Sequence, residues 1–361
     1  MFNLLNLYPG AFGLDISDLS LKIAEIKQQK NQLKLNVLDK SSLDEGIVEK
    51  GEIVDIERLA KSIKKLVSKK QKIKTKQVIV SLPEEKSFVR VLQMPRMSKE
   101  EVKSAVEFEA ENYIPFSPDK VYLDSHIIQS TEKDSKYIEV LLVALPKKTV
   151  DSYVSAIFQA GLTPIVMETE SQATARAIIK GERIENPIFI ADIGVTSTNF
   201  SVYRGSSLCF TSFIPFSSDR LTSAIAKSLK IQFSKAQKLK ELYGFQQTGD
   251  RAKKLSEALS PVLTEFIYEI KKHIDYYQTH AKEKRLFGKE EEVKKLLLCG
   301  GGANLHGLLK FLSEETGLVV QKANPLVNLP VEEKRIKGKD REKILPYATA
   351  IGLALRSYKR E

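Results

Sequence analysis

The segment "FIADIGVTSTNFSVYRG", residues Phe189 to Gly205, decides the fold that the sequence predicts. Its apolar start leads into Asp192 and Gly194, and hydroxyl side chains follow directly. A carboxylate at the end of a buried strand, before a tight turn rich in amides and hydroxyls, suits phosphate oxygens and a hydrated magnesium ion. The stretch "FGLDISDLSLKIAEI", from Phe12 to Ile26, has a similar layout around Asp15. The sequence therefore carries two candidate phosphate hairpins.

Length and composition predict two domains or lobes. The chain has 361 residues, of which 42% are apolar, enough to bury two sizeable cores. It contains no apolar run of about eighteen residues, and its first residues lack the pattern of a signal peptide. Two cysteines are too few for a disulfide framework. We therefore expect a soluble, cytoplasmic protein.

The formal net charge of +11 comes mostly from lysine, with a dense run at residues 61–76. Single-stranded nucleic-acid binding commonly adds aromatic side chains to such a run, and this one has none. Asp55 precedes it as a helix cap, and apolar residues recur at helical spacing. We expect the lysines to form the solvated side of a helix and predict no nucleic-acid partner.

Residues 86–162 read as an inserted module of strand, helix, two strands and helix. Ser98 and Glu101 form a capping box at the start of the first helix, and Gly161 ends the second. The face predicted for the second helix consists of Val150, Tyr153, Val154, Ile157 and Phe158.

The region from residue 217 to 285 is predicted to be almost wholly helical. Its longest helix starts at Ser260 and Pro261. The apolar stripe of this helix consists of Leu263, Phe266, Ile267, Ile270, Ile274 and Tyr277. The charged stretch 332–343 is predicted to be a solvated loop.

Common catalytic constellations are missing from the sequence. The four histidines lack metal-ligand spacing, and there is no Walker loop or nucleophile elbow. A third feature beside the two hairpins is "CGGGANLHGLLKFL" (Cys299 to Leu312), a strand, glycines and a helix. Glycines there allow the backbone to approach a flat ring or a phosphate closely. Together the three features predict a nucleotide site.

The order of these features resembles a known superfamily. The Asp15 hairpin, "ETESQATA" (168–175), the Asp192 hairpin, "GGGA" (300–303) and "ATAIGLAL" (348–355) are similar to the phosphate 1, connect 1, phosphate 2, adenosine and connect 2 motifs of actin, Hsp70 and sugar kinases. The inserted module indicates which family within this superfamily the chain resembles. Its "FEAENYIPFSPDKVYLD" (108–124), with "LQMPRMS" (92–98) and "ANPL" (323–326), resembles the type IV pilus assembly protein PilM family, relatives of the cell-division protein FtsA.

The resemblance implies an α/β actin-like ATPase fold. Two ribonuclease-H-like lobes would surround a nucleotide cleft, with an inserted FtsA-type, SHS2-like subdomain 1C. The implied boundaries are 12–85, 163–182 and 344–361 for subdomain 1A, 86–162 for 1C, 187–216 and 293–343 for 2A, and 217–292 for the helical 2B. The implied ligand is ATP with magnesium.

The resemblance also assigns roles to individual residues. Asp15 and Asp192 would face the magnesium ion through water, and Glu170 would orient the attacking water. The phosphate-binding residues would be Ser17, Ser20, Lys22, Gly194, Thr196, Ser197, Thr198 and Asn199. The adenosine-binding residues would be Gln237, Lys240, Gly300, Gly301, Gly302 and Asn304.

The first hairpin departs from the family pattern. Ser17 replaces a glycine, and Asp18 and Leu19 replace two hydroxyl residues. A carboxylate aimed at a phosphate would repel it, so we expect Asp18 to turn outward, cap the turn and contact water. Gln237 stands where a glutamate commonly binds the ribose. We therefore expect ATP binding with weak or absent hydrolysis.

The leading functional expectation is a cytoplasmic ATP-binding adaptor of the type IV pilus inner-membrane platform. It would dock the N-terminal cytoplasmic tail of PilN in a groove between 1A and 1C, with nucleotide and tail as linked binding events. Its membrane association would be indirect, and contacts with other platform or motor proteins and self-association fit the same role. "FNLLNLYP" (2–9) resembles the Asn-Leu-Leu tail of PilN proteins and suggests occupation of that groove by the chain itself.

Other functions remain open from the sequence. One is an active ATPase or small-molecule kinase of the same superfamily, although no clear substrate-pocket motif is present. Another is an FtsA-like filament former, although no terminal membrane-anchoring helix is expected after "LRSYKRE".

Overall fold

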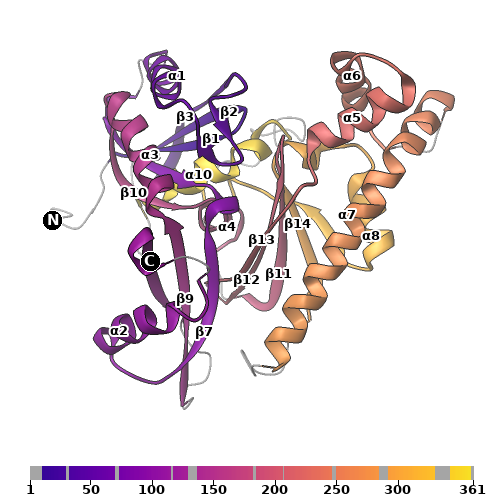
Figure 1. The fold of residues 1–361 in the computed structure, drawn as a ribbon. Helices are drawn as coiled ribbons and strands as arrows, with labels where there is room; N and C mark the ends of the chain where they lie inside the picture. Colours follow the sequence, from indigo (N-terminus) through magenta and orange to yellow (C-terminus); the bar gives the residue numbers. More distant parts are fainter. Residues whose placement is uncertain are drawn as a thin grey trace. The chain divides into compact units, whose positions relative to one another are not determined.

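The chain folds into two compact units, each built on a five-stranded sheet (Figure 1). Unit 1 comprises Met1–Glu182 and Asn324–Glu361, and unit 2 comprises Arg183–Ala323. The computed structural model describes residues 10–29, 32–69, 73–114, 117–128, 136–181, 184–205, 207–245, 249–283, 292–329 and 342–358. Two sheet-rich lobes are therefore present, as the sequence predicts.

The sheet of unit 1 has the strand order β10-β6-β1-β2-β3. Its strands are β1 (Phe12–Ser17), β2 (Ser20–Gln29), β3 (Gln32–Ser42), β6 (Gln77–Leu82) and β10 (Thr163–Thr169). The β1-β2 and β2-β3 pairs are antiparallel, whereas β6 runs parallel to both β1 and β10. A small hairpin, β4 (Val48–Glu49) and β5 (Glu52–Ile53), precedes helix α1 (Ile56–Ser68). Asp55 caps α1 by accepting from the Arg58 N–H, so the predicted cap is confirmed.

The inserted module has its own three-stranded sheet, with the order β7-β9-β8. It consists of β7 (Phe88–Pro95), α2 (Lys99–Ala110), η2 (Pro118–Lys120), β8 (Val121–Ile128) and β9 (Tyr137–Pro146). The predicted capping box of Ser98 and Glu101 is present at the start of α2. Strand β9 pairs antiparallel with both neighbours. The buried apolar side chains of this module form a core separate from that of the five-stranded sheet.

Helix α3 (Lys147–Gln159) packs into the core of the five-stranded sheet. Tyr153 and Ile157 are completely buried there, as predicted. Phe158, predicted on the same face, is instead 57% exposed. At 3.6 residues per turn it lies about 140° around the helix from Tyr153, which is outside the buried stripe.

Helices α4 (Glu170–Ile178) and α10 (Ala348–Arg356) pack closely against each other. The side-chain oxygens of Thr174 and Thr349 are 2.9 Å apart. A β-carbon added at Gly352 would overlap the backbone carbonyl of Ala173. Small residues therefore allow the backbones of the two predicted connecting helices to touch. Unit 1 also contains two short 3-10 turns, η1 (Glu84–Lys86) and η5 (Leu345–Tyr347).

The sheet of unit 2 has the order β13-β12-β11-β14-β15. Its strands are β11 (Ile184–Ile193), β12 (Thr198–Gly205), β13 (Ser207–Ile214), β14 (Lys295–Cys299) and β15 (Val319–Lys322). The first three form antiparallel pairs, and β14 runs parallel to β11 and β15. The helices are α5 (Ser218–Leu229), α6 (Phe233–Tyr243), α7 (Asp250–Glu283), the short η3 (Gly301–Asn304) and α8 (Leu308–Thr316).

The predicted start of the longest helix is wrong. Helix α7, the long helix beside α8 in Figure 1, begins at Asp250 and contains Pro261 in its interior. A proline inside a helix costs about 3 kcal/mol relative to alanine, but Leu255, Leu259 and Leu263 are buried on both sides of it. Burial of this continuous stripe offsets the cost. The predicted stripe itself is confirmed, since Leu263, Phe266, Ile267, Ile270, Ile274 and Tyr277 are all buried.

Some sequence predictions fall outside the described residues. These are the tail-like segment 2–9, Pro115 and Phe116 of the "YIPF" motif, part of the lysine-rich run at 70–72, and most of the charged stretch, at 332–341. A helix with the length and hydropathy of a membrane span is absent from the part of the chain that the structure describes.

Candidate functional site

In unit 1 the first hairpin holds a buried carboxylate beside a cation. Asp15, near the end of β1, is 3% exposed. Lys22 Nζ, its cross-strand partner, donates to Asp15 Oδ2 at 2.8 Å and to Ser17 Oγ at 3.4 Å. Ser81 Oγ donates to the other carboxylate oxygen at 3.1 Å. The ammonium group compensates the buried charge, and half-buried Ser20 pairs with Ser17 across the turn.

Asp18, in the turn of the same hairpin, caps a neighbouring turn rather than its own. Its carboxylate accepts from the N–H groups of Lys50 and Gly51 at 3.2 and 3.0 Å. Gly51 has φ +73, and its carbonyl accepts from the Tyr153 hydroxyl at 3.2 Å. The predicted capping by Asp18 is therefore corrected in one respect: the half-buried carboxylate caps the turn at Lys50 and Gly51, more than thirty residues away, instead of its own turn.

Glu170 is the first residue of α4 and is half-buried. The next residue, Ser171, donates its N–H to the buried carboxylate of Glu84 at 3.0 Å, so Glu84 caps this helix. Burial, and then the charges of Glu170, Asp18 and Asp15, raise the pKa of the Tyr153 phenol well above its ordinary value. The fold thus brings Glu170 of α4 close to the same phenol ring as two acids of the first hairpin, about 150 residues earlier in the sequence.

In unit 2 the second hairpin closes as a tight turn. Gly194 N–H donates to the carbonyl of Ser197 at 2.8 Å, and Asp192 pairs with Asn199 across the hairpin. Thr196 is exposed and Ser197 is half-buried, whereas Thr198 is completely buried. The Thr198 hydroxyl donates to the carbonyl of Phe216 at 2.8 Å. In this conformation Thr198 anchors the hairpin, and its predicted phosphate contact stays a prediction.

The start of α5 supports this hairpin. The N–H groups of Ser218 and Asp219 donate to the carbonyls of Gly194 and Val195 at 3.0 and 3.1 Å. These are amides of the first helical turn, which have no partner within the helix. They hold the hairpin backbone in place.

The glycine-rich turn packs directly on the end of β11. Gly300 has φ +77, and a β-carbon there would overlap the Asp192 carboxylate. A β-carbon at Gly302 would overlap the side chain of Ile193. Burial and the neighbouring Asp192 carboxylate raise the pKa of the Cys299 thiol well above its ordinary value. The glycine-rich turn therefore packs in direct contact with the strand end that leads into the second hairpin. In this turn Gly301 is exposed and Asn304 is half-buried.

Helix α6 carries the two other predicted adenosine contacts. Gln237 is exposed and donates to Glu241 Oε1 at 3.2 Å. Lys240 is 8% exposed, and its Nζ donates to the carbonyl of Ser218, to Ser218 Oγ and to Thr222 Oγ1, each at 2.7 Å. Burial lowers the pKa of Lys240. The contacts of both residues with a nucleoside stay predictions.

Each unit, taken by itself, has a donor set of a kind that suits phosphate oxygens or a hydrated magnesium ion. Unit 1 offers a lysine and hydroxyls around Asp15, and unit 2 offers hydroxyls and a glycine-rich backbone around Asp192. The described residues contain no cluster of three or more His, Cys, Asp or Glu side chains that would hold a metal ion directly. A magnesium ion held by single carboxylates through water matches the way this ion keeps its hydration shell.

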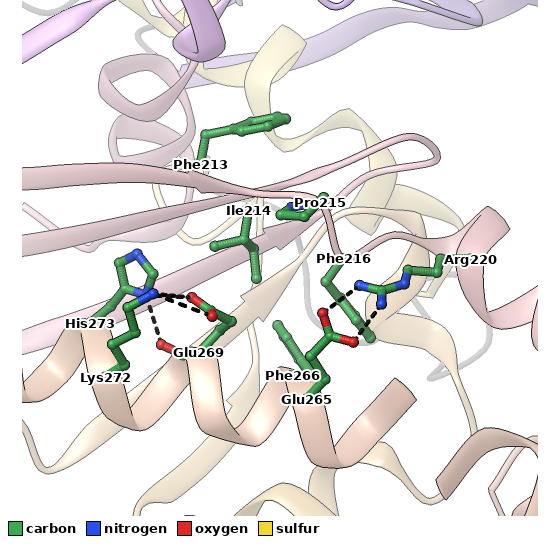
Figure 2. A pocket seen from close by; sticks show the side chains of 10 residues that line it. All are labelled: Phe213, Ile214, Pro215, Phe216, Arg220, Glu265, Phe266, Glu269, Lys272 and His273. Atoms are coloured by element: carbon green, nitrogen blue, oxygen red, sulfur yellow. Dashed lines mark hydrogen bonds and ion pairs between the residues drawn. The ribbon is translucent and has the colours of Figure 1, made fainter. Parts of the chain in front are cut away.

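A separate pocket of about 290 Å³ lies in unit 2 between the end of β13 and α7 (Figure 2). The Phe216 and Phe266 rings stack with centroids 3.8 Å apart. Arg220 pairs with Glu265, and His273 lies between Ser212 Oγ, at 2.8 Å, and the Glu269 carbonyl, at 2.7 Å. The residues that line this pocket come from two segments about fifty positions apart, so the sequence pattern does not predict the pocket. None of the predicted site residues lines it.

Known proteins share this fold. A solved "PilM-PilN type IV pilus biogenesis complex" matches with a TM-score of 0.80 and 27% identity, covering 97% of this chain and 99% of that chain. The ethanolamine utilization protein EutJ from Carboxydothermus hydrogenoformans matches with a TM-score of 0.56 and 14% identity, covering 96% of this chain and 89% of that chain. MreB 5 of Spiroplasma citri bound to AMPPNP matches with a TM-score of 0.52 and 13% identity, covering 92% and 96%. The architecture is therefore the actin-like ATPase fold, as the sequence predicts.

Sequence relatives agree with this assignment. The cell division protein FtsA of Streptococcus pneumoniae serotype 2 is 24% identical over 344 residues, which is 86% of this chain and 74% of that protein. The family model for the type IV pilus assembly protein PilM matches residues 13–358. The chain therefore belongs to the type IV pilus assembly protein PilM family.

Proposed function

We propose that the protein is an ATP-binding adaptor of type IV pilus assembly that docks the cytoplasmic tail of a PilN partner. The observation that carries the nucleotide part is the packing of the glycine-rich turn against Asp192, beside a hairpin whose backbone is held by α5. Such an arrangement of amides and hydroxyls suits a phosphate group without large rearrangement on binding, and its carboxylate suits the hydrated magnesium ion that accompanies the phosphate.

Different residues of the site would then bind different parts of Mg-ATP. Lys22, Ser17 and Ser20 of the first hairpin, and the amides and hydroxyls of residues 194–199, would bind phosphate oxygens. Asp15 and Asp192 would hold the hydrated magnesium ion, which supplies positive charge to the polyphosphate. Gly300, Gly301, Gly302, Asn304 and Gln237 would lie against the adenosine.

Weak or absent hydrolysis is part of the proposal. Glu170 would orient water, but its charge, like those of Asp18 and Asp15, acts on the Tyr153 phenol, whose pKa is raised first by burial and then by these three acids. That charge opposes a hydroxide-like nucleophile near the same carboxylates. A protein that retains ATP fits this environment better than a fast ATPase.

The partner part of the proposal concerns unit 1. A relative of this chain was solved as a PilM-PilN complex. We place the tail of PilN in the groove between subdomains 1A and 1C, with 1C as residues 86–162, on the side of α2. Phe108 on α2 is 72% exposed and Tyr113 beyond it 36%, so aromatic surface is available there for an apolar tail. The protein would then be cytoplasmic and attached to the inner membrane through this partner.

The test is a calorimetric titration of the full chain with a PilN tail peptide, with and without Mg-ATP, and with a scrambled peptide as control. We expect specific binding of the tail and a change in its affinity when ATP is bound. If neither ATP nor tail binds, the adaptor function is wrong. Tail affinity that is independent of ATP would remove only the linkage between the two ligands.

The Asp192→Asn variant distinguishes binding of Mg-ATP from binding of the PilN tail. It should weaken Mg-ATP binding at least tenfold and leave tail affinity in the absence of ATP unchanged. Rapid release of phosphate by the wild-type chain would instead favour the active ATPase or kinase.

A further inference from the structure

Lys240 is a buried cation whose partners are neutral. The side chain is 8% exposed, and among the described residues the acceptors of its Nζ are a carbonyl and two hydroxyl oxygens, at 2.7 Å each. A buried ammonium group commonly pairs with a carboxylate, because removing it from water is costly. Here Asp219 and Glu241 act only through their charge, and burial dominates. Another favourable interaction must therefore offset the free-energy cost of burying the Lys240 ammonium group.

The contacts of Lys240 lead to the second hairpin. Its ammonium group holds Ser218 through both the carbonyl and the hydroxyl, and Thr222 one helical turn later. Ser218 in turn donates its N–H to the carbonyl of Gly194 at 3.0 Å, and the next residue, Asp219, donates to Val195 at 3.1 Å. One side chain on α6 therefore fixes the helical turn on which the hairpin backbone rests.

The electrostatics of this arrangement favour an anion. The first turn of a helix is the positive end of its dipole, so a cation there is unfavourable by itself. Lys240 adds its charge at that end of α5, next to Ser218, where the carboxylate of Asp219 in the same turn compensates part of it. A negative group at the hairpin would gain from both the helix and the ammonium group, even without contact with Lys240.

We propose that Lys240 is a positioning residue for the phosphate-binding hairpin rather than a direct contact of the nucleoside. This inference rests on the proposed function in that the anion is the polyphosphate of ATP. It assigns to Lys240 the fixing of the α5 first turn, and through it the loop 194–197. The polyphosphate part of the ligand then depends on Lys240, and the nucleoside part does not.

The first experiment needs no nucleotide. Hydrogen exchange is followed by mass spectrometry in Lys240→Met, with Lys238→Met, an exposed lysine on the same helix, as the control. We expect peptides covering residues 194–199 and 215–222 to exchange at least fivefold faster in Lys240→Met only, and residues 263–277 of α7 to keep their protection. Unchanged exchange in the first two segments would overturn the proposal, whether or not ATP binds.

The second experiment separates positioning from contact. Thr222→Val and Ser218→Ala keep the ammonium group, and each removes one of its three acceptors while the Ser218 carbonyl remains. Each should weaken Mg-ATP binding three- to tenfold, and Lys240→Met/Thr222→Val should bind no more weakly than Lys240→Met. These variants also serve if Lys240→Met does not fold. Adenosine competition should be within twofold of wild type throughout.

Distinct outcomes test the two claims. A direct nucleoside contact predicts full ATP affinity in Thr222→Val and Ser218→Ala, and equal losses for ATP and adenosine in Lys240→Met; that result overturns the positioning role. A wild-type chain that fails to bind ATP contradicts the proposed function, while the exchange result still decides whether Lys240 positions the hairpin.

Discussion

Asp18 and Glu85 are neighbouring acids in unit 1 with different surroundings. Asp18 accepts two backbone N–H groups, from Lys50 and Gly51. Glu85 has a raised pKa, first because it is partly buried and second because the Asp18 charge is close. The Asp18 carboxylate therefore stabilises the turn at Lys50 and Gly51, whereas burial of the Glu85 carboxylate is unfavourable when it is ionised.

The Asp18→Ala variant should lower the free energy of unfolding by about 2 kcal/mol, since hydrogen bonds to a charged group are worth about that much. Urea denaturation at pH 7 measures the loss. The control is Asp44→Ala, whose side chain is 84% exposed, and which should stay within about 0.5 kcal/mol of wild type. An equal effect in both variants would mean that the bonds of Asp18 add nothing.

Glu85→Gln should raise the melting temperature at pH 7.5. A carboxyl whose folded-state pKa is raised contributes stability below its unfolded pKa of 4.5 and loses that contribution as pH rises through the folded value. The advantage of the glutamine should therefore shrink as the pH is lowered toward 4.5. Glu52→Gln is the control, because Lys86 lowers the pKa of Glu52 and removal of that charge should bring no gain at pH 7.5. A constant advantage across the pH range would refute the assignment.

At the scale of elements, the α4-α10 packing is the tightest constraint in unit 1. The backbone of α10 at Gly352 lies against the carbonyl of Ala173, and Arg176 Nη1 also donates to the Gly352 carbonyl at 3.2 Å. Two helices can approach this closely only where one of them lacks a β-carbon.

The Gly352→Ala variant should therefore lose about 3 kcal/mol of stability, because the helices must separate to admit the methyl group. The matched control is Gly161→Ala, where the added β-carbon meets nothing and only the positive φ of +81 is strained, at about 1 kcal/mol. Chemical denaturation of both variants gives the comparison. Equal losses would show that the helices repack freely.

At the scale of the whole molecule, the last described helix completes unit 1. Arg356 on α10 donates to Glu168 Oε2 at 2.6 Å, and Arg176 on α4 binds the same carboxylate. Glu168 is 6% exposed, so this cluster joins β10, α4 and the C-terminal segment away from water. The two segments of unit 1 are thereby joined across almost two hundred residues of sequence.

The Arg356→Ala variant should lower stability by about 2 kcal/mol, because it removes a charged hydrogen bond from a largely buried carboxylate. The surface pair of Arg58 and Asp44, 3.4 Å apart, provides the control, and Arg58→Ala should change stability by less than about 0.5 kcal/mol. Thermal unfolding of the two variants side by side measures the difference. Comparable small shifts would show that Arg176 alone satisfies Glu168.

The sequence by itself determined the order of elements, the actin-like fold and the N-caps of α1 and α2. Asp55, Ser98 and Glu101 act within one helical turn of chain, so local physics settles their roles. The buried stripe of α7 could be predicted from the sequence for the same reason, since helical periodicity is a local property.

Only the tertiary structure decided where side chains with several suitable partners would bind. Asp18 bonds to amides more than thirty residues away, Thr198 to the carbonyl of Phe216, and Lys240 to α5. Pro261 likewise remains inside a helix because distant apolar contacts offset its local cost. Hydrogen-bond acceptors and apolar surfaces that come together only on folding leave no periodic signal in the sequence, so these choices required the folded chain.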